Sequence, residues 1–193
     1  MNCRPLLHPK GKTGSEEVSH GMTVWFWNFT LYSFLGFLLE VAYARATGGR
    51  CNRKCLLVLP LCPVYGLGAC AILWLSPWAK GFSPLLFVLS TAAATGVEYA
   101  AAFFYETLLG VSFWDYRQLH WNIHGRVCLP FSLAWGCLSL LLVYWLQPML
   151  GPYLTAISPL VTWMAAGTVM LDFLLSSALL KRTGDISCLR WYA

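Results

Sequence analysis

Five stretches of mostly apolar residues, separated by short polar segments, dominate the hydropathy pattern of the chain. A membrane-crossing helix needs about 20 mainly apolar residues. The stretches lie near Thr23 to Ala44, Cys55 to Ser76, Pro84 to Leu109, Val127 to Leu146 and Ile157 to Leu180. None shows the alternation of a barrel strand, and isolated strands cannot cross lipid. The pattern therefore predicts an all-α fold, a polytopic membrane helical bundle of about five transmembrane helices.

Composition agrees with this prediction. Apolar residues make up 58% of the chain and charged residues 11%, and the mean hydropathy is +0.60, whereas an ordinary soluble domain is about 25% charged. Disorder, a coiled coil and a water-soluble enzyme domain are thereby excluded. We expect a mobile polar tail at 1–22, a single transmembrane domain at 23–182 and a short C-terminal tail at 183–193.

The basic residues divide unevenly between the two sides of the predicted bundle. Cytoplasmic loops of membrane proteins carry an excess of Lys and Arg. The side that holds the first loop, the third loop and the C-terminus carries nine of the 13, and the other side carries Arg4, Lys10, Lys12 and Lys80. We therefore expect a multi-pass cell-membrane protein with its N-terminus outside and its C-terminus in the cytoplasm. The net charge of +5 then reflects topology, and we expect membrane lipid rather than nucleic acid as its partner.

Acidic residues interrupt the apolar stretches at several points. Glu40, Glu98, Glu106 and Asp172 lie within predicted spans, and Asp115 lies just beyond one. A charged side chain at mid-bilayer costs about 2.5–3.5 kcal/mol on insertion scales, so such groups must be paired, protonated or hydrated. Their positions place them toward the cytoplasmic side, and we expect Glu40, Glu98 and Glu106 to share one polar pocket near the inner leaflet.

Arg126, at the start of the fourth span, is the candidate partner for a carboxylate of the third span, because a guanidinium can bind a carboxylate through two nitrogens. Tyr99 lies on the same broad helix face as Glu106 and could donate its hydroxyl to a carboxylate. The remaining tryptophans, including Trp74, Trp78, Trp135 and Trp145, are expected at lipid-facing or interfacial positions.

The second span contains the segment LPLCPVYGLG, in which two prolines remove helical donors and two glycines lower helix propensity. A kinked or broken helix is expected, either as a packing kink or as part of a binding site. The eight cysteines are not expected to form a disulfide framework, because four of them fall inside spans. Cys51, Cys55, His120 and His124 have spacings that could hold Zn²⁺, but solvated loop residues are the simpler interpretation, and we expect no metal.

Several blocks resemble a bacterial membrane-protein family, the putative ABC-transporter type IV permeases. They are YSFLGFLLE, NRKCLLVLPLCPVYGLG, VEY, WDY and NIHGRVCLPFSLAWG, in this order between about residues 30 and 145. Lys54 and Leu59 stand where the family pattern favours glycine. The resemblance implies a small helical bundle and carries the following candidate pocket positions: Glu40, Asn52, Arg53, Pro63, Tyr65, Glu98, Tyr99, Asp115, Asn122 and Arg126. The intramembrane acids add Glu106 to this set.

Three functions remain open at this stage. The first is a transporter permease component that binds a polar solute, ion or lipid headgroup. No G-x-x-x-x-G-K-[ST] sequence occurs, so ATP coupling would need a separate ATPase subunit, whereas proton coupling through Glu98 would need none, because burial favours a neutral carboxyl group. The second is a membrane-embedded enzyme acting on a lipid or isoprenoid phosphate, although no catalytic residues or cofactor are indicated. The third is a structural or accessory subunit. Homo-oligomerisation is compatible with each, because five helices enclose little space.

Overall fold

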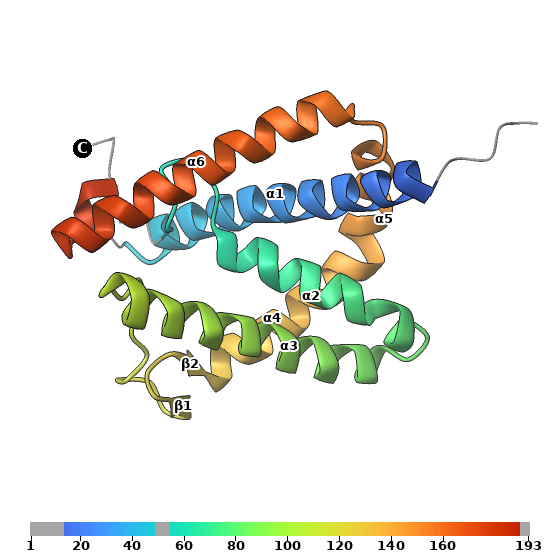
Figure 1. The fold of residues 1–193 in the computed structure, drawn as a ribbon. Helices are drawn as coiled ribbons and strands as arrows, with labels where there is room; N and C mark the ends of the chain where they lie inside the picture. Colours follow the sequence, from blue (N-terminus) through green and yellow to red (C-terminus); the bar gives the residue numbers. More distant parts are fainter. Residues whose placement is uncertain (1–13, 49–54, 190–193) are drawn as a thin grey trace, which may run out of the picture.

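The computed structural model describes residues 14–48 and 55–189 of the chain, with side chains from residue 21 onward (Figure 1). The α-helices are α1 (Gly14–Ala46), α2 (Pro63–Ala79), α3 (Ser83–Phe104), α4 (Leu129–Leu141), α5 (Gln147–Leu154) and α6 (Pro159–Thr183). A π-helical turn, Tyr105–Leu109, continues α3, and a second, Leu142–Leu146, joins α4 to α5. The two-residue strands β1 (Asn122–Ile123) and β2 (Val127–Cys128) pair antiparallel.

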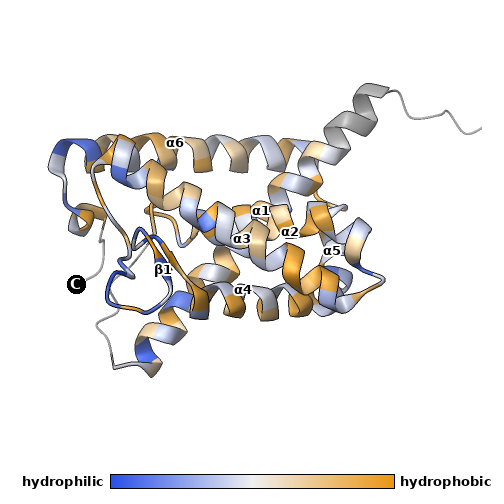
Figure 2. Cartoon of the chain, turned by 90° about the horizontal axis from the view of Figure 1, so that it is seen from below, coloured by the Kyte–Doolittle hydropathy of each residue, from blue (hydrophilic) through white to orange (hydrophobic). Residues whose placement is uncertain are grey.

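The predicted all-α membrane bundle is confirmed. Four helical stretches of the described chain are long and apolar enough to cross a membrane, namely Gly21–Ala46, Ser83–Leu109, Leu129–Leu154 and Pro159–Thr183. Helix α1 packs on α2 and α6, α2 packs on α3, and α3 packs on α4. The start of α1 and the end of α6 lie at opposite ends of the bundle (Figure 1). Hydrophilic residues gather around the β1–β2 hairpin and at the end of α6, away from the apolar helix bodies (Figure 2).

The second predicted span differs from expectation at its start. Residues 55–62 are irregular rather than helical, and α2 begins at Pro63. Proline suits the first helical position because its missing N–H needs no partner there. Gly66 and Gly68 lie inside the uninterrupted helix. The break therefore precedes the helix, and α2 has 17 residues, about 26 Å at 1.5 Å per residue.

The irregular segment 55–62 obtains hydrogen-bond partners from other helices. The backbone N–H groups of Val58 and Leu59 donate to the two carboxylate oxygens of Asp172 at 3.1 and 2.8 Å, and the N–H of Cys62 donates to the Ser33 carbonyl at 2.9 Å. Backbone donors without partners are costly in a membrane. Asp172 thus stabilises an irregular segment of the chain.

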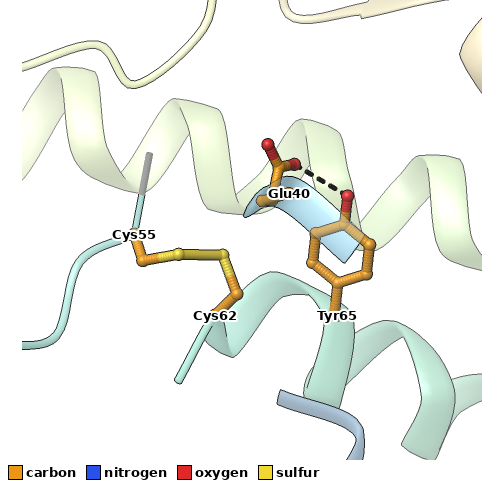
Figure 3. Close-up of a disulfide and its surroundings, with 4 residues drawn as sticks. All are labelled: Glu40, Cys55, Cys62 and Tyr65. Atoms are coloured by element: carbon orange, nitrogen blue, oxygen red, sulfur yellow. Dashed lines mark hydrogen bonds between the residues drawn. A yellow bond between two sulfur atoms is a disulfide. The ribbon is translucent and has the colours of Figure 1, made fainter. Parts of the chain in front are cut away.

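A disulfide joins Cys55 to Cys62 and so closes the irregular segment at both ends (Figure 3). The expectation of cysteines without disulfides is wrong at this pair. A continuous helix would carry the two sulfurs apart, whereas the irregular path brings the two Cα atoms within 5.0 Å, inside the usual disulfide range. The disulfide also removes Cys55 from the considered zinc set, and Cys51 lies outside the described residues.

Glycines let α1, which carries Glu40, and α2 approach closely. A Cβ atom at Gly36 of α1 would overlap the ring of Tyr65, and one at Gly66 of α2 would overlap Ser33 and the backbone of Phe29. Small residues at helix crossings allow such contact in membrane bundles. The α1–α2 crossing therefore holds Tyr65 against α1.

The segment between α3 and α4 is ordered by its own polar groups. The Asn122 side chain donates to the Leu119 carbonyl at 2.7 Å and accepts from the Gly125 N–H at 3.0 Å. Gly125 has a φ of +71°, and a Cβ there would meet the Arg117 side chain. Trp114 Nε1 donates to the Arg126 carbonyl at 2.8 Å. These bonds set the positions from which Tyr116 and Arg126 reach the helices.

Candidate functional site

A cavity of about 720 Å³ lies between α1, the start of α2, α3 and α4, and the segment before β1 also lines it. Pockets of roughly 300–1,000 Å³ commonly hold small molecules. Its walls are mainly aromatic and aliphatic, with two carboxylates among them. The lining residues are Leu39, Glu40, Tyr43, Cys62, Val64, Tyr65, Glu98, Trp114, Tyr116, Phe131, Ala134, Trp135, Cys137 and Leu138.

The first carboxylate, Glu40, comes from the last third of α1 and is half-buried. The Tyr65 hydroxyl of α2 donates to Glu40 Oε1 at 2.7 Å, beside the Cys55–Cys62 disulfide (Figure 3). The donor is neutral, so it orients the carboxylate without cancelling its charge.

The second carboxylate, Glu98, comes from the middle of α3 and is only 5% exposed. Tyr116 donates its hydroxyl to Oε1 at 3.0 Å, and Trp135 of α4 donates Nε1–H to Oε2 at 2.9 Å. Burial, reinforced by the negative charge of Glu98, raises the pKa of Tyr116, so the phenol remains a proton donor. Glu98 is therefore fixed by neutral donors from two other parts of the chain.

The aromatic rings pack on one another around these carboxylates. Tyr116 stacks on Phe131 with centroids 5.0 Å apart and planes inclined by 21°, and Tyr65 lies 4.9 Å from Trp135. Tyr43 approaches Phe131 edge-on at 6.4 Å. The five rings form the aromatic wall of the cavity as two packed groups, one of Tyr43, Phe131 and Tyr116 and one of Tyr65 and Trp135.

A second polar cluster lies at the cytoplasmic end predicted for α3, outside the cavity lining. Arg126 donates from Nε and Nη2 to Glu106 Oε2 at 2.8 and 2.7 Å, and from Nη1 to the Tyr99 hydroxyl at 2.9 Å. His124 Nδ1 lies 2.9 Å from the same hydroxyl. The predicted Arg126–carboxylate pair is confirmed. Tyr99, however, contacts Arg126 and His124 rather than a carboxylate, and Glu106 does not share the pocket of Glu40 and Glu98.

The remaining predicted site residues lie at or beyond the cavity edge. Pro63 begins α2 between the lining residues Cys62 and Val64. Asp115 is exposed and accepts from the Arg117 N–H at 2.9 Å, and Asn122 orders the hairpin turn. Asn52 and Arg53 lie outside the described residues.

Sequence reasoning missed the aromatic partners of the carboxylates. Trp135 was expected at a lipid-facing position but donates to Glu98 inside the bundle, whereas Trp74, Trp78 and Trp145 are 60, 65 and 74% exposed. The WDY and AWG blocks contain Tyr116 and Trp135 and were the available signal. A lone tryptophan in an apolar stretch gives no sign of its hydrogen-bond partner. Within the described residues no group of three or more His, Cys, Asp or Glu side chains could hold a metal ion.

Comparison with known proteins gives one result that bears on function. No curated protein and no solved structure matches the chain significantly. Residues 27–179, which hold both carboxylates, the aromatic wall and the Arg126 cluster, match a family described as putative ABC-transporter type IV. Because the match covers most of the chain, this membrane protein belongs to the putative ABC-transporter type IV family.

Proposed function

We propose that this protein is the membrane component of an ABC-type transporter and that the 720 Å³ cavity is its solute site. One observation carries the proposal. Glu40 of α1 and Glu98 of α3, two acids from separate helices, line the same cavity although charges within membrane spans are costly. Ionisable groups retained at such positions usually mark a substrate or ion path. The cavity would bind a polar solute or the headgroup of a membrane lipid.

Transport by this component would draw energy from a partner. The sequence contains no phosphate-binding G-x-x-x-x-G-K-[ST] loop, so a separate ATPase subunit would dock on the side that holds the hairpin and the end of α6. The excess of Lys and Arg on that side supports its cytoplasmic location in a cell membrane. Asn52 and Arg53, which lie outside the described residues, remain predicted contributors to the site. A homo-oligomer would place the largely exposed α6 against a second copy.

The observed lining weighs against the phosphate-directed enzyme considered from the sequence. Among the described residues, the cavity lining contains two carboxylates and no Lys, Arg or His. Phosphate oxygens would meet repulsion there, since anion sites depend on Arg, Lys or backbone N–H groups. The Arg126–Glu106 cluster, in contrast, favours a structural role for those residues, because each charge already has its partner.

Solutes that copurify with the protein provide the test. Wild-type protein and four variants would be purified in lipid nanodiscs, extracted and compared by mass spectrometry. Ala134→Trp fills the cavity from α4 and Glu98→Gln removes a lining charge, whereas Ala100→Trp enlarges an exposed position of α3 outside the cavity and Asp185→Asn removes an exposed charge beyond α6. We expect a solute that is retained in wild type and both control variants and lost in both cavity variants. A solute profile that is identical in all five proteins would refute the cavity as the site.

A further inference from the structure

We infer that the ligand of this cavity is an amphiphilic organic cation, such as an alkylamine or a quaternary ammonium compound, which reaches the cavity from the bilayer between α1 and α4. The inference rests on the proposed function and specifies the ligand class. Charge, aromatic composition and the position of the opening each support it.

The two carboxyl groups of the lining favour a positive ligand over an anion. Both lining carboxylates are held by neutral donors, Tyr65 for Glu40 and Tyr116 with Trp135 for Glu98. In the part of the chain that the structure describes, the ion pairs are Arg117–Asp115 and Arg126–Glu106, and neither includes a cavity carboxylate. A bound cation would supply the missing countercharge, whereas an anion would add to the repulsion.

The walls favour an organic cation over a metal ion. The faces of Trp, Tyr and Phe attract cations, most strongly when water is excluded, and aromatic cages are the usual binding mode for quaternary ammonium groups. The aromatic wall of the cavity supplies rings of this kind next to the carboxylates, from Tyr116, Phe131, Tyr65 and Trp135. A volume of about 720 Å³ exceeds the roughly 30 Å³ share of one water molecule by far, and no metal-binding group of side chains occurs among the described residues.

The opening of the cavity explains why the cation should carry an apolar part. Leu39 and Tyr43 of α1 line the cavity and remain 42 and 53% exposed, and Ala134 and Cys137 of α4 line it and are also exposed. Both helices belong to candidate membrane spans, so these exposed residues border the lipid. A ligand that enters there crosses an apolar rim before its charged group meets Glu40 and Glu98.

The experiment compares one alkyl chain with different headgroups. Octyltrimethylammonium, 1-octanol and octyl sulfate would be titrated calorimetrically into protein in nanodiscs, with empty nanodiscs as the blank, and tetramethylammonium would test the need for the chain. We expect wild type to bind octyltrimethylammonium at least tenfold more tightly than each of the other three probes. Glu40→Gln and Glu98→Gln should each weaken binding of this cation at least tenfold, and Asp185→Asn should change it less than twofold.

Several results would overturn the inference. Equal or tighter binding of octanol or octyl sulfate would refute the cationic class, and if that binding is lost in Ala134→Trp, the cavity function itself would still stand. Unchanged cation affinity in both glutamine variants, or no binding of any probe, would also refute it. If Glu98→Gln does not fold, Glu40→Gln decides the matter, since Glu40 is only half-buried and the glutamine oxygen still accepts from the Tyr65 hydroxyl.

Discussion

Replacing Asp172 by Ala should weaken the attachment of the irregular segment 55–62 to α6, leaving the packing of Leu56 and Leu57 near Leu180. The carboxylate accepts from the Val58 and Leu59 N–H groups at 3.1 and 2.8 Å and from the Ser176 hydroxyl at 3.1 Å. A hydrogen bond to a charged group contributes roughly 1.5–3 kcal/mol. Part of the loss is offset because alanine needs no desolvation. We expect the free energy of unfolding to fall by roughly 2–4 kcal/mol.

Asp172→Ala should loosen the 55–62 segment itself and also lower the stability of the whole protein. Hydrogen–deuterium exchange of a peptide that covers residues 55–62 should be faster in Asp172→Ala, and the Tm in detergent should fall. Asp172→Asn should be intermediate, because its amide retains one acceptor oxygen for the two N–H groups. Arg182→Ala provides the control, since it removes an exposed charged side chain near the end of α6. Unchanged exchange of the 55–62 peptide in Asp172→Ala would refute the assignment of Asp172 to this segment.

Three further changes test the site and its support. Trp135→Phe keeps the ring contact with Tyr65 but removes the Nε1–H donor to the buried Glu98 carboxylate, so the free energy of unfolding in detergent should fall by roughly 1.5–3 kcal/mol. Arg126→Gln and Glu106→Gln should each lower the Tm by several degrees, and the double variant should recover most of the loss, which a double-mutant cycle measures. Dithiothreitol should lower the free energy of unfolding of wild type by about 2–3 kcal/mol, because the reduced chain loses the loop that the disulfide closes in the unfolded state. A Cys55→Ser, Cys62→Ser double variant should have this lower free energy of unfolding with or without reductant.

The periodic and compositional signals predicted the helical bundle because burial in lipid acts on every residue of a span. The Arg126–Glu106 pair was also predictable, since a cation and an acid at the same end of neighbouring helices have few other partners in a membrane. Glu40 and Glu98 were correctly expected to share a pocket. Each of these predictions depends on a residue's depth and charge alone.

The errors concern contacts that depth and charge do not determine. The start of α2 moved from Cys55 to Pro63 because Asp172, more than 100 residues away in sequence, satisfies the amides of the irregular segment. Without that distant acceptor, a helix would have the lower free energy for the same apolar residues, because it satisfies its own backbone N–H groups. The prediction of a lipid-facing Trp135 was wrong for a similar reason, because its indole N–H donates to Glu98 of another helix.

The intramembrane acids of the bundle have two kinds of partner, a cation for one acid and neutral donors for two others. Glu106 is matched by Arg126, so it can be buried with no ligand present. Glu40 and Glu98 receive bonds from tyrosine and tryptophan alone among the described residues, and they face an open cavity. A fold that needed these acids only for stability would gain more from apolar residues of the same size. Their place in the cavity is therefore best explained by a positively charged ligand, and replacing both by glutamine should abolish binding of octyltrimethylammonium in the calorimetric titration.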